Sequence, residues 1–108
     1  MSQGERKGWY SVRCIFKASD RDAYEERITL WLAESIDDAI RRAETEASEY
    51  GADIGLTYVG FAQAYDLKTT SVENGSEVFS LIRESSLQAS DYIDRFFDTG
   101  TELERKGK

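Results

Sequence analysis

The chain has 108 residues, 40% of them hydrophobic and 32% charged, and its 14 basic residues against 21 acidic ones give a net charge of −7. We expect a single domain, with an ordered part from about 8 to 100 and charged tails at both ends. The acidic balance disfavours nucleic acid and anionic membranes as partners, because either would require a basic surface. The opening residues lack the apolar core of a signal peptide and no apolar run is long enough to span a membrane, so we expect a cytoplasmic location.

The first part of the chain predicts an antiparallel hairpin. In both 9–17 and 24–33, alternate side chains fall into one set for each face of a strand. A short polar turn at 19–22 joins the two segments. In the first strand the set expected to face the core is Tyr10, Val12, Cys14 and Phe16, and the opposite set is Trp9, Ser11, Arg13, Ile15 and Lys17. In the second strand the apolar alternation places Ile28, Leu30 and Leu32 toward the core and Trp31 away from it.

A capped amphipathic helix is expected directly after the second strand. Ser35 has the residue type of an N-cap, and Asp38 stands three residues later, as in a capping box. The apolar stripe of this helix is narrow and rich in alanine, which suits close packing on a sheet: Ile36, Ala39, Ile40, Ala43, Ala47 and Tyr50. Gly51 is of the type that commonly ends a helix, so we expect the helix to end there.

The second half of the chain predicts the same order of elements in shorter form. A third strand is expected at about 57–67, a turn at the Asn-Gly pair within 73–76, and a fourth strand at about 77–83. A short helix should follow, from Ser90 or Asp91 to about Phe97. The order β-β-α-β-β-α predicts a two-layer α+β fold, with a four-stranded, mainly antiparallel sheet and both helices on one face.

Five segments together resemble a known protein family: GWYSVRCIF at 8–16, YEERITLWLAES at 24–35, VGFAQAYDL at 59–67, EVFSLIRES at 77–85 and YIDRFFDTGTE at 92–102. The family is an uncharacterised bacterial one, called domain of unknown function 4288, and the resemblance extends over about 8–102. It implies a small bacterial stand-alone protein. It implies no activity, cofactor or catalytic residue.

The residue types that the chain lacks exclude several kinds of chemistry. Without histidine and with the single cysteine Cys14, which we expect to be a small buried hydrophobe, zinc sites and Ser-His-Asp or Cys-His catalysis are excluded. The glycine motifs of nucleotide-binding loops are missing too. The triplet Asp98-Thr99-Gly100 occurs in aspartic proteases, but here it follows an expected helix and is interpreted as a helix end. We expect no catalytic, cofactor-binding or metal-binding residue, although a carboxylate-based enzyme remains open.

Large apolar side chains gather on the sheet face that the helices would leave uncovered. The interface candidates are Trp9, Ile15, Trp31 and either Tyr58 or Phe61. A monomer seldom exposes a large apolar patch, and aromatic residues are enriched in interface cores. We expect this face to form a homodimer or to bind another protein, with cover by the chain's own termini as the remaining alternative.

Two functions follow as hypotheses. The first is a non-enzymatic protein-interaction domain, and a toxin-neutralising (immunity-type) or defence-associated protein is one concrete form of it. Small size, acidity and the lack of catalytic groups favour this function. The alternative is a small-molecule-binding or carboxylate-based enzyme domain, with a pocket between sheet and helices that includes Arg13, Glu26 and Tyr65.

Overall fold

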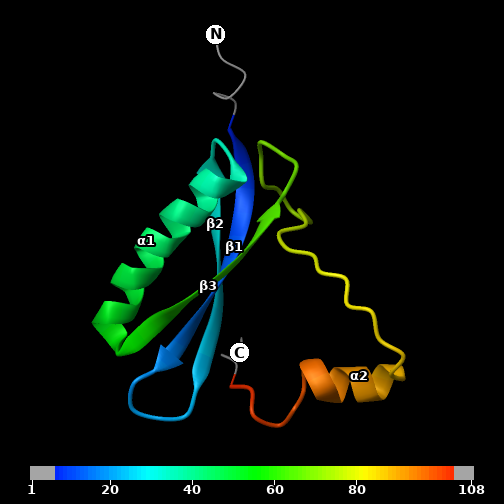
Figure 1. The fold of residues 1–108 in the computed structure, drawn as a ribbon. Coiled ribbons are helices and arrows are strands. Elements are labelled where there is room, and N and C mark those ends of the chain that lie inside the picture. Colours follow the sequence, from blue (N-terminus) through cyan, green and yellow to red (C-terminus); the bar gives the residue numbers. More distant parts are fainter. Residues whose placement is uncertain (1–6, 104–108) are drawn as a thin grey trace.

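Three antiparallel strands and two helices form the protein in the computed structural model, which describes residues 7–103 (Figure 1). In chain order the elements are β1 (Gly8–Ala18), β2 (Tyr24–Ala33), α1 (Ile36–Ile54), β3 (Leu56–Asp66) and α2 (Ala89–Phe96). The strand order in the sheet is β2-β1-β3, so β1 is central and pairs with both neighbours. The predicted α+β class is confirmed, and the first three strands and the long helix lie close to their predicted positions.

The predicted fourth strand is not found among the described residues. Residues 77–83 run as an extended segment that joins no ladder, and side chains rather than backbone groups attach it to the sheet. The expectation that both helices cover one face is also wrong. Only α1 packs on the sheet, whereas α2 lies at the end of a long connection on the other side of the molecule (Figure 1).

The core lies between α1 and the central strand. The buried side chains of α1 are the alanines that the sequence placed on its stripe, Ala39, Ala43 and Ala47. They pack against Val12 and Phe16 of β1, which are fully buried. Because alanine adds only a methyl group, the helix axis can lie close to the sheet, and the larger strand residues fill the space between them.

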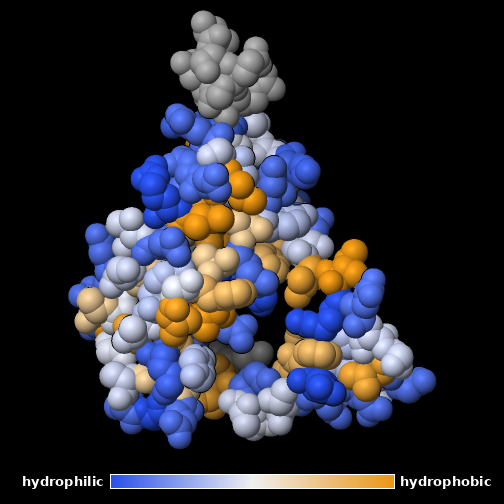
Figure 2. Space-filling view, in the orientation of Figure 1, coloured by the Kyte–Doolittle hydropathy of each residue, from blue (hydrophilic) through white to orange (hydrophobic). Residues whose placement is uncertain are grey.

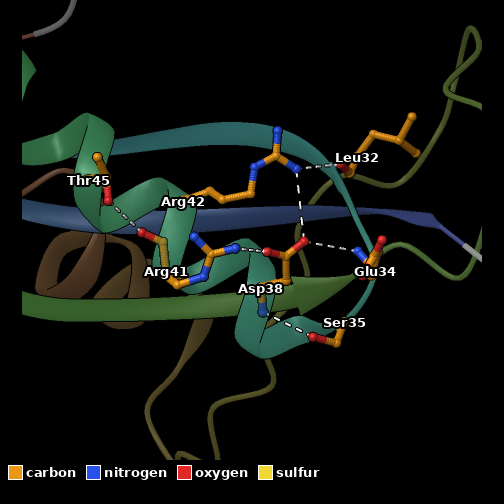
Figure 3. Close-up of polar contacts among 7 residues, drawn as sticks. All are labelled: Leu32, Glu34, Ser35, Asp38, Arg41, Arg42 and Thr45. Carbon is orange, nitrogen blue, oxygen red and sulfur yellow. Dashed lines mark hydrogen bonds and ion pairs between the residues drawn. The ribbon is translucent and has the colours of Figure 1, made fainter. Parts of the chain in front are cut away.

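A cluster of polar contacts at the start of α1 fixes the junction between β2 and the helix (Figure 3). Ser35 is the N-cap, and its Oγ accepts a hydrogen bond of 3.0 Å from the Asp38 N–H. The Asp38 carboxylate in turn accepts from the N–H of Glu34 at 3.2 Å and from Arg41. The hydrogen bond from Glu34, together with the neighbouring arginines, lowers the pKa of the Asp38 carboxyl. The predicted cap is confirmed, and it determines where the chain turns from strand to helix.

The end of α1 differs from the expectation. The helix continues past Gly51 to Ile54, and its C-cap is Gly55, which has a left-handed φ of 74° and donates its N–H to the Gly51 carbonyl. Gly51 itself is buried within the helix. A Cβ at this position would overlap the carbonyl oxygen of Leu56, the first residue of β3. Gly51 is therefore required because the next strand passes close to the helix backbone, and Gly55 is required by its φ.

We predict that Gly51→Ala destabilises the protein, although glycine-to-alanine changes inside a helix normally stabilise it by about 1 kcal/mol. The added methyl group meets the Leu56 backbone, and overpacking of this kind costs about 1–3 kcal/mol. The free energy of unfolding in urea, measured by circular dichroism, tests this. Ser48→Ala, an exposed change on the same helix, is the control and should be neutral or slightly stabilising. A Gly51→Ala protein as stable as the wild type would contradict the proposed close contact.

Candidate interaction surface

The sheet has one face covered by α1 and one face without a covering helix, which is called the open face below. The register pairs Tyr10 with Trp31 and Val12 with Thr29, so these residues share the α1 face. Trp31 packs against the buried core, and the expectation that it points away from the helix is wrong. The predicted facing of β2 is therefore reversed, and its apolar alternate residues lie on the open face.

Polar contacts with the flank of α1 explain this reversal. Arg27 of β2 donates two hydrogen bonds, of 2.8 and 2.9 Å, to the Glu46 carboxylate, and its guanidinium lies 3.7 Å from the centroid of the Tyr50 ring. Tyr50 donates from its hydroxyl to Glu25 at 2.8 Å. The helix flank above β2 is thus charged rather than apolar. Because a strand presents alternate residues to opposite faces, pairing the polar set with this flank turns the apolar set outwards.

The open face carries a row of partly exposed apolar side chains. Ile28, Leu30 and Leu32 of β2 are 45%, 41% and 39% exposed. Phe61 of β3 is 50% exposed, and Ile15 lies between the two strands on the central one. Such a row beside the buried core is the arrangement expected of a surface that another apolar surface covers.

The C-terminal arm, defined as residues 77–103, crosses one end of the open face. Phe79 lies 6.0 Å from the Tyr65 ring, centroid to centroid, and the guanidinium of Arg13 lies 5.1 Å from the Phe79 centroid. The Tyr65 hydroxyl donates to Glu77 at 2.8 Å, and this bond raises the pKa of Tyr65. Ser11, which points to the same end of this face, is fully buried. The arm therefore covers only the end of the open face near these residues.

The rest of the arm stands away from the sheet and encloses a space of about 1040 Å³ with it. Figure 2 shows the surface hollowed between the sheet and the part of the chain that carries α2. Charged residues make up about half of the border of this space, and the large apolar residues among the rest include Ile15 and Phe61 of the sheet and Leu81, Phe96, Phe97 and Leu103 of the arm. Phe97 is 57% exposed, and none of the described strands or α1 packs against α2. Two apolar surfaces thus face each other without filling the space between them.

The overall dimensions agree with an arm that is not packed on the core. The radius of gyration is 16.3 Å, whereas a compact domain of about 100 residues has a value near 13 Å. The chain extends over 52 × 36 × 30 Å. Within the arm, Arg83 stabilises the position of α2, since its guanidinium lies 4.2 Å from the Phe96 centroid and donates to the Tyr92 hydroxyl at 3.0 Å.

The three pocket candidates of the sequence all lie on the open face, and two of them border the space beneath the arm. Arg13 donates from Nε to the Gln63 side chain at 3.0 Å, and its Nη1 lies 3.6 Å from Glu26. Tyr65 lies outside the bordering set and contacts it through Phe79. The polar floor therefore consists of Arg13, Glu26 and Gln63. Sequence reasoning missed Gln63 and Phe79, although the pairing of Gln63 with Arg13 follows from the strand register.

The interface candidates divide between the two faces. Trp9 and Ile15 lie on the open face of β1, and of the two alternatives on β3 it is Phe61 that lies there. Tyr58 lies on the α1 face, where its ring is 5.9 Å from that of Phe16 and its hydroxyl donates to Glu44. Burial and this hydrogen bond raise the pKa of Tyr58. Tyr58 and Phe61 lie on opposite faces because they are three residues apart along an alternating strand. The irregularity opposite Ile15 adds two residues to β3 and therefore keeps this alternation.

Residues that could support other chemistry are placed as follows. Cys14 is buried against α1, and burial raises the pKa of its thiol, as expected for a structural cysteine. Within residues 7–103, no three side chains of the metal-binding types come together. Neither helix described here combines the length and apolar character needed to cross a membrane.

These features define a three-stranded α+β domain with one covered and one open sheet face. Comparison of the chain with family models, with curated proteins and with solved structures found no match in any of the three.

We predict that the pairing of Arg27 with Glu46 gives the protein part of its stability above the ordinary glutamate pKa of about 4.3. The hydrogen bond from Arg27 lowers the pKa of Glu46 in the folded protein. A lowered folded pKa means that this stability is complete above the unfolded value and is lost as the pH falls through the folded one. Glu46→Gln should therefore lower the free energy of unfolding at pH 7 by about 0.5 kcal/mol. The free energy of unfolding of this variant should also fall less steeply as the pH is lowered.

Urea unfolding at a series of pH values between neutral and acid measures both effects. Glu49→Gln, an exposed change on the same helix, should leave the free energy of unfolding and its pH dependence close to those of the wild type. If the two variants behave alike, the Arg27 contact does not hold β2 under the helix.

Proposed function

We propose that the protein is a non-enzymatic protein-interaction domain whose open sheet face, together with the C-terminal arm, binds another protein. The observation that carries this proposal is the reversal of β2, which places Ile28, Leu30 and Leu32 on the open face while polar residues lie beneath α1. This arrangement leaves apolar area in water, and binding of a partner would remove it from water.

The chemistry of the surface indicates the kind of partner. Aromatic and aliphatic residues lie around the polar floor of Arg13, Glu26 and Gln63. An apolar centre with a few polar groups is the usual composition of protein–protein interfaces. The net charge of −7 favours a basic partner at long range. A toxin-neutralising or defence-associated role in the bacterial cytoplasm is one form of this function.

Self-association is the second part of the proposal. The open face and the apolar side of α2 both remain partly exposed in the single chain. A homodimer that joins two open faces side by side would offer a partner a larger apolar surface, and closed two-fold dimers are the commonest oligomers of soluble proteins.

Binding of a small molecule is the alternative function, and one observation favours it. The space beneath the arm, about 1040 Å³, is at the upper end of the range of ligand pockets, which is about 300–1,000 Å³. It lies between the sheet and α2, whereas α1 and the sheet enclose a packed core. The size of this space and its mixed border of apolar and charged residues fit a protein segment better than a compact ligand.

We predict that Phe61→Glu abolishes capture of the partner. Phe61 is half exposed on the open face of β3 and borders the space beneath the arm, so a charge there should prevent apolar contact without disturbing the core. Affinity capture from a lysate of the source organism, followed by mass spectrometry, should recover a protein with the wild type that is lost with this variant. Ile54→Glu, at a site of similar exposure (54%) at the end of α1, should retain it.

Recovery of the same proteins with both variants would contradict the role of the open face. Recovery of none with the wild type would contradict the binding function. Circular dichroism of the three proteins shows whether each is folded before the capture is compared.

A further inference from the structure

The outer edge of β2 has no strand beside it among the described residues. In an antiparallel ladder the N–H and C=O of one residue point to the same side, and successive residues alternate. Ala23 accepts a hydrogen bond from Ala18 on the β1 side, whereas the Leu32 carbonyl accepts from Arg42 of α1 on the outer side. The even-numbered residues of β2 therefore direct their backbone groups outwards, away from β1.

The two edges of the sheet differ in how they are protected from pairing. The β3 edge contains the bulge opposite Ile15 and Gly60 with a φ of 86°, and both features interrupt a regular ladder. Over its ten residues β2 has no glycine, proline, lysine or bulge. Proline, lysine and bulges commonly prevent an edge strand from pairing, and the charged residues of β2 lie together at 25–27, so the β2 edge is the less protected of the two.

The length of free edge determines how a second strand would pair. Arg42 occupies the Leu32 carbonyl at 2.7 Å, which closes one end of the edge. The outward backbone groups of Glu26, Ile28 and Leu30 remain, and this segment is symmetric about Ile28. An antiparallel strand of the same sequence can therefore pair with it around a two-fold axis at Ile28.

We propose that β2 pairs with β2 of a second copy of this chain, antiparallel and with the two Ile28 residues opposite each other, so that two three-stranded sheets become one of six strands. In this register Glu26 lies opposite Leu30 of the second copy, and Arg27 lies opposite Thr29. This register places no like charges directly opposite each other, which matters because such pairs destabilise an antiparallel ladder. This inference rests on the self-association in the proposed function and assigns it a surface.

The position of α1 permits this dimer. A two-fold axis perpendicular to the sheet places both copies of α1 on the same face, and each helix packs over its own β1. Three strand spacings separate the two copies of β1, which is about 14 Å. A helix with its side chains is about 10–12 Å wide, so the two helices fit side by side. The partly exposed rows of the two open faces then form one continuous apolar surface.

Analytical ultracentrifugation of the full chain tests the proposal with a matched pair of variants. Ile28→Lys places two lysines opposite each other at the proposed two-fold axis, and Val59→Lys introduces the same charge on β3 at nearly equal exposure, 45% against 46%. We expect the wild type, Val59→Lys and Phe61→Glu to sediment as dimers and Ile28→Lys to sediment as a monomer with an unchanged circular dichroism spectrum. A dimer that persists in Ile28→Lys, or is lost equally in Val59→Lys, overturns the assignment.

A crosslink tests the register independently of any loss of folding. Ile28→Cys places two thiols across the proposed axis, and diamide should oxidise them to a disulfide-linked dimer, while the native Cys14 is buried and should not react. Val59→Cys is the control and should remain a single chain. Absence of the Ile28→Cys crosslink overturns the register. A wild type that is monomeric throughout overturns this inference and the self-association on which it rests, whereas capture of a different protein through Phe61 would still support the binding of another protein.

Discussion

Ala39, Ala43 and Ala47 bring α1 close to β1, and Gly51 brings it close to the first residue of β3. This close approach depends on the absence of larger side chains along one stripe of the helix. It decides that α1 lies over the central strand, and that strand holds both of its neighbours in the sheet. The position of the helix in turn decides which side chains of β2 meet it. The covered face, the open face and the free edge all follow from this one contact.

The open face results from a competition between two patterns in β2. Its apolar alternation favours burial of Ile28, Leu30 and Leu32, whereas the charged flank of α1 favours Arg27 beneath the helix. Arg27, held by two hydrogen bonds to Glu46 and stacked on Tyr50, lies beneath the helix together with Trp31, which packs against the core, so these residues of β2 occupy the covered face. The apolar residues are then available to a partner, and the binding function we propose uses the surface that this arrangement exposes.

Local signals in the sequence predicted much of the fold, and tertiary contacts account for the rest. The cap at Ser35 and the alternation of 9–17 act within a few residues, and both were confirmed. The facing of Trp31 was wrong because it depends on the flank of a helix that follows it in the chain. The strand expected at 77–83 was wrong because this segment crosses the open face, where Phe79 packs against Tyr65, and does not run along either edge of the sheet. Of the candidate surface, Trp9 and Ile15 were assigned from alternation, which left Tyr58 or Phe61 open on the third strand, and the contribution of the arm could not be assigned.

The separation of α2 from the core has a consequence for how the protein opens. Amide hydrogens of β1 and α1 belong to one packed unit, and their exchange with solvent requires most of that unit to unfold. The hydrogen bonds of α2 depend on a helix of eight residues, too short to be stable by itself in water. The arm can therefore melt and re-form while the sheet remains intact. A measurement that follows unfolding of the core would not detect the separate melting of the arm, which is faster. A bound partner would slow the melting of the arm.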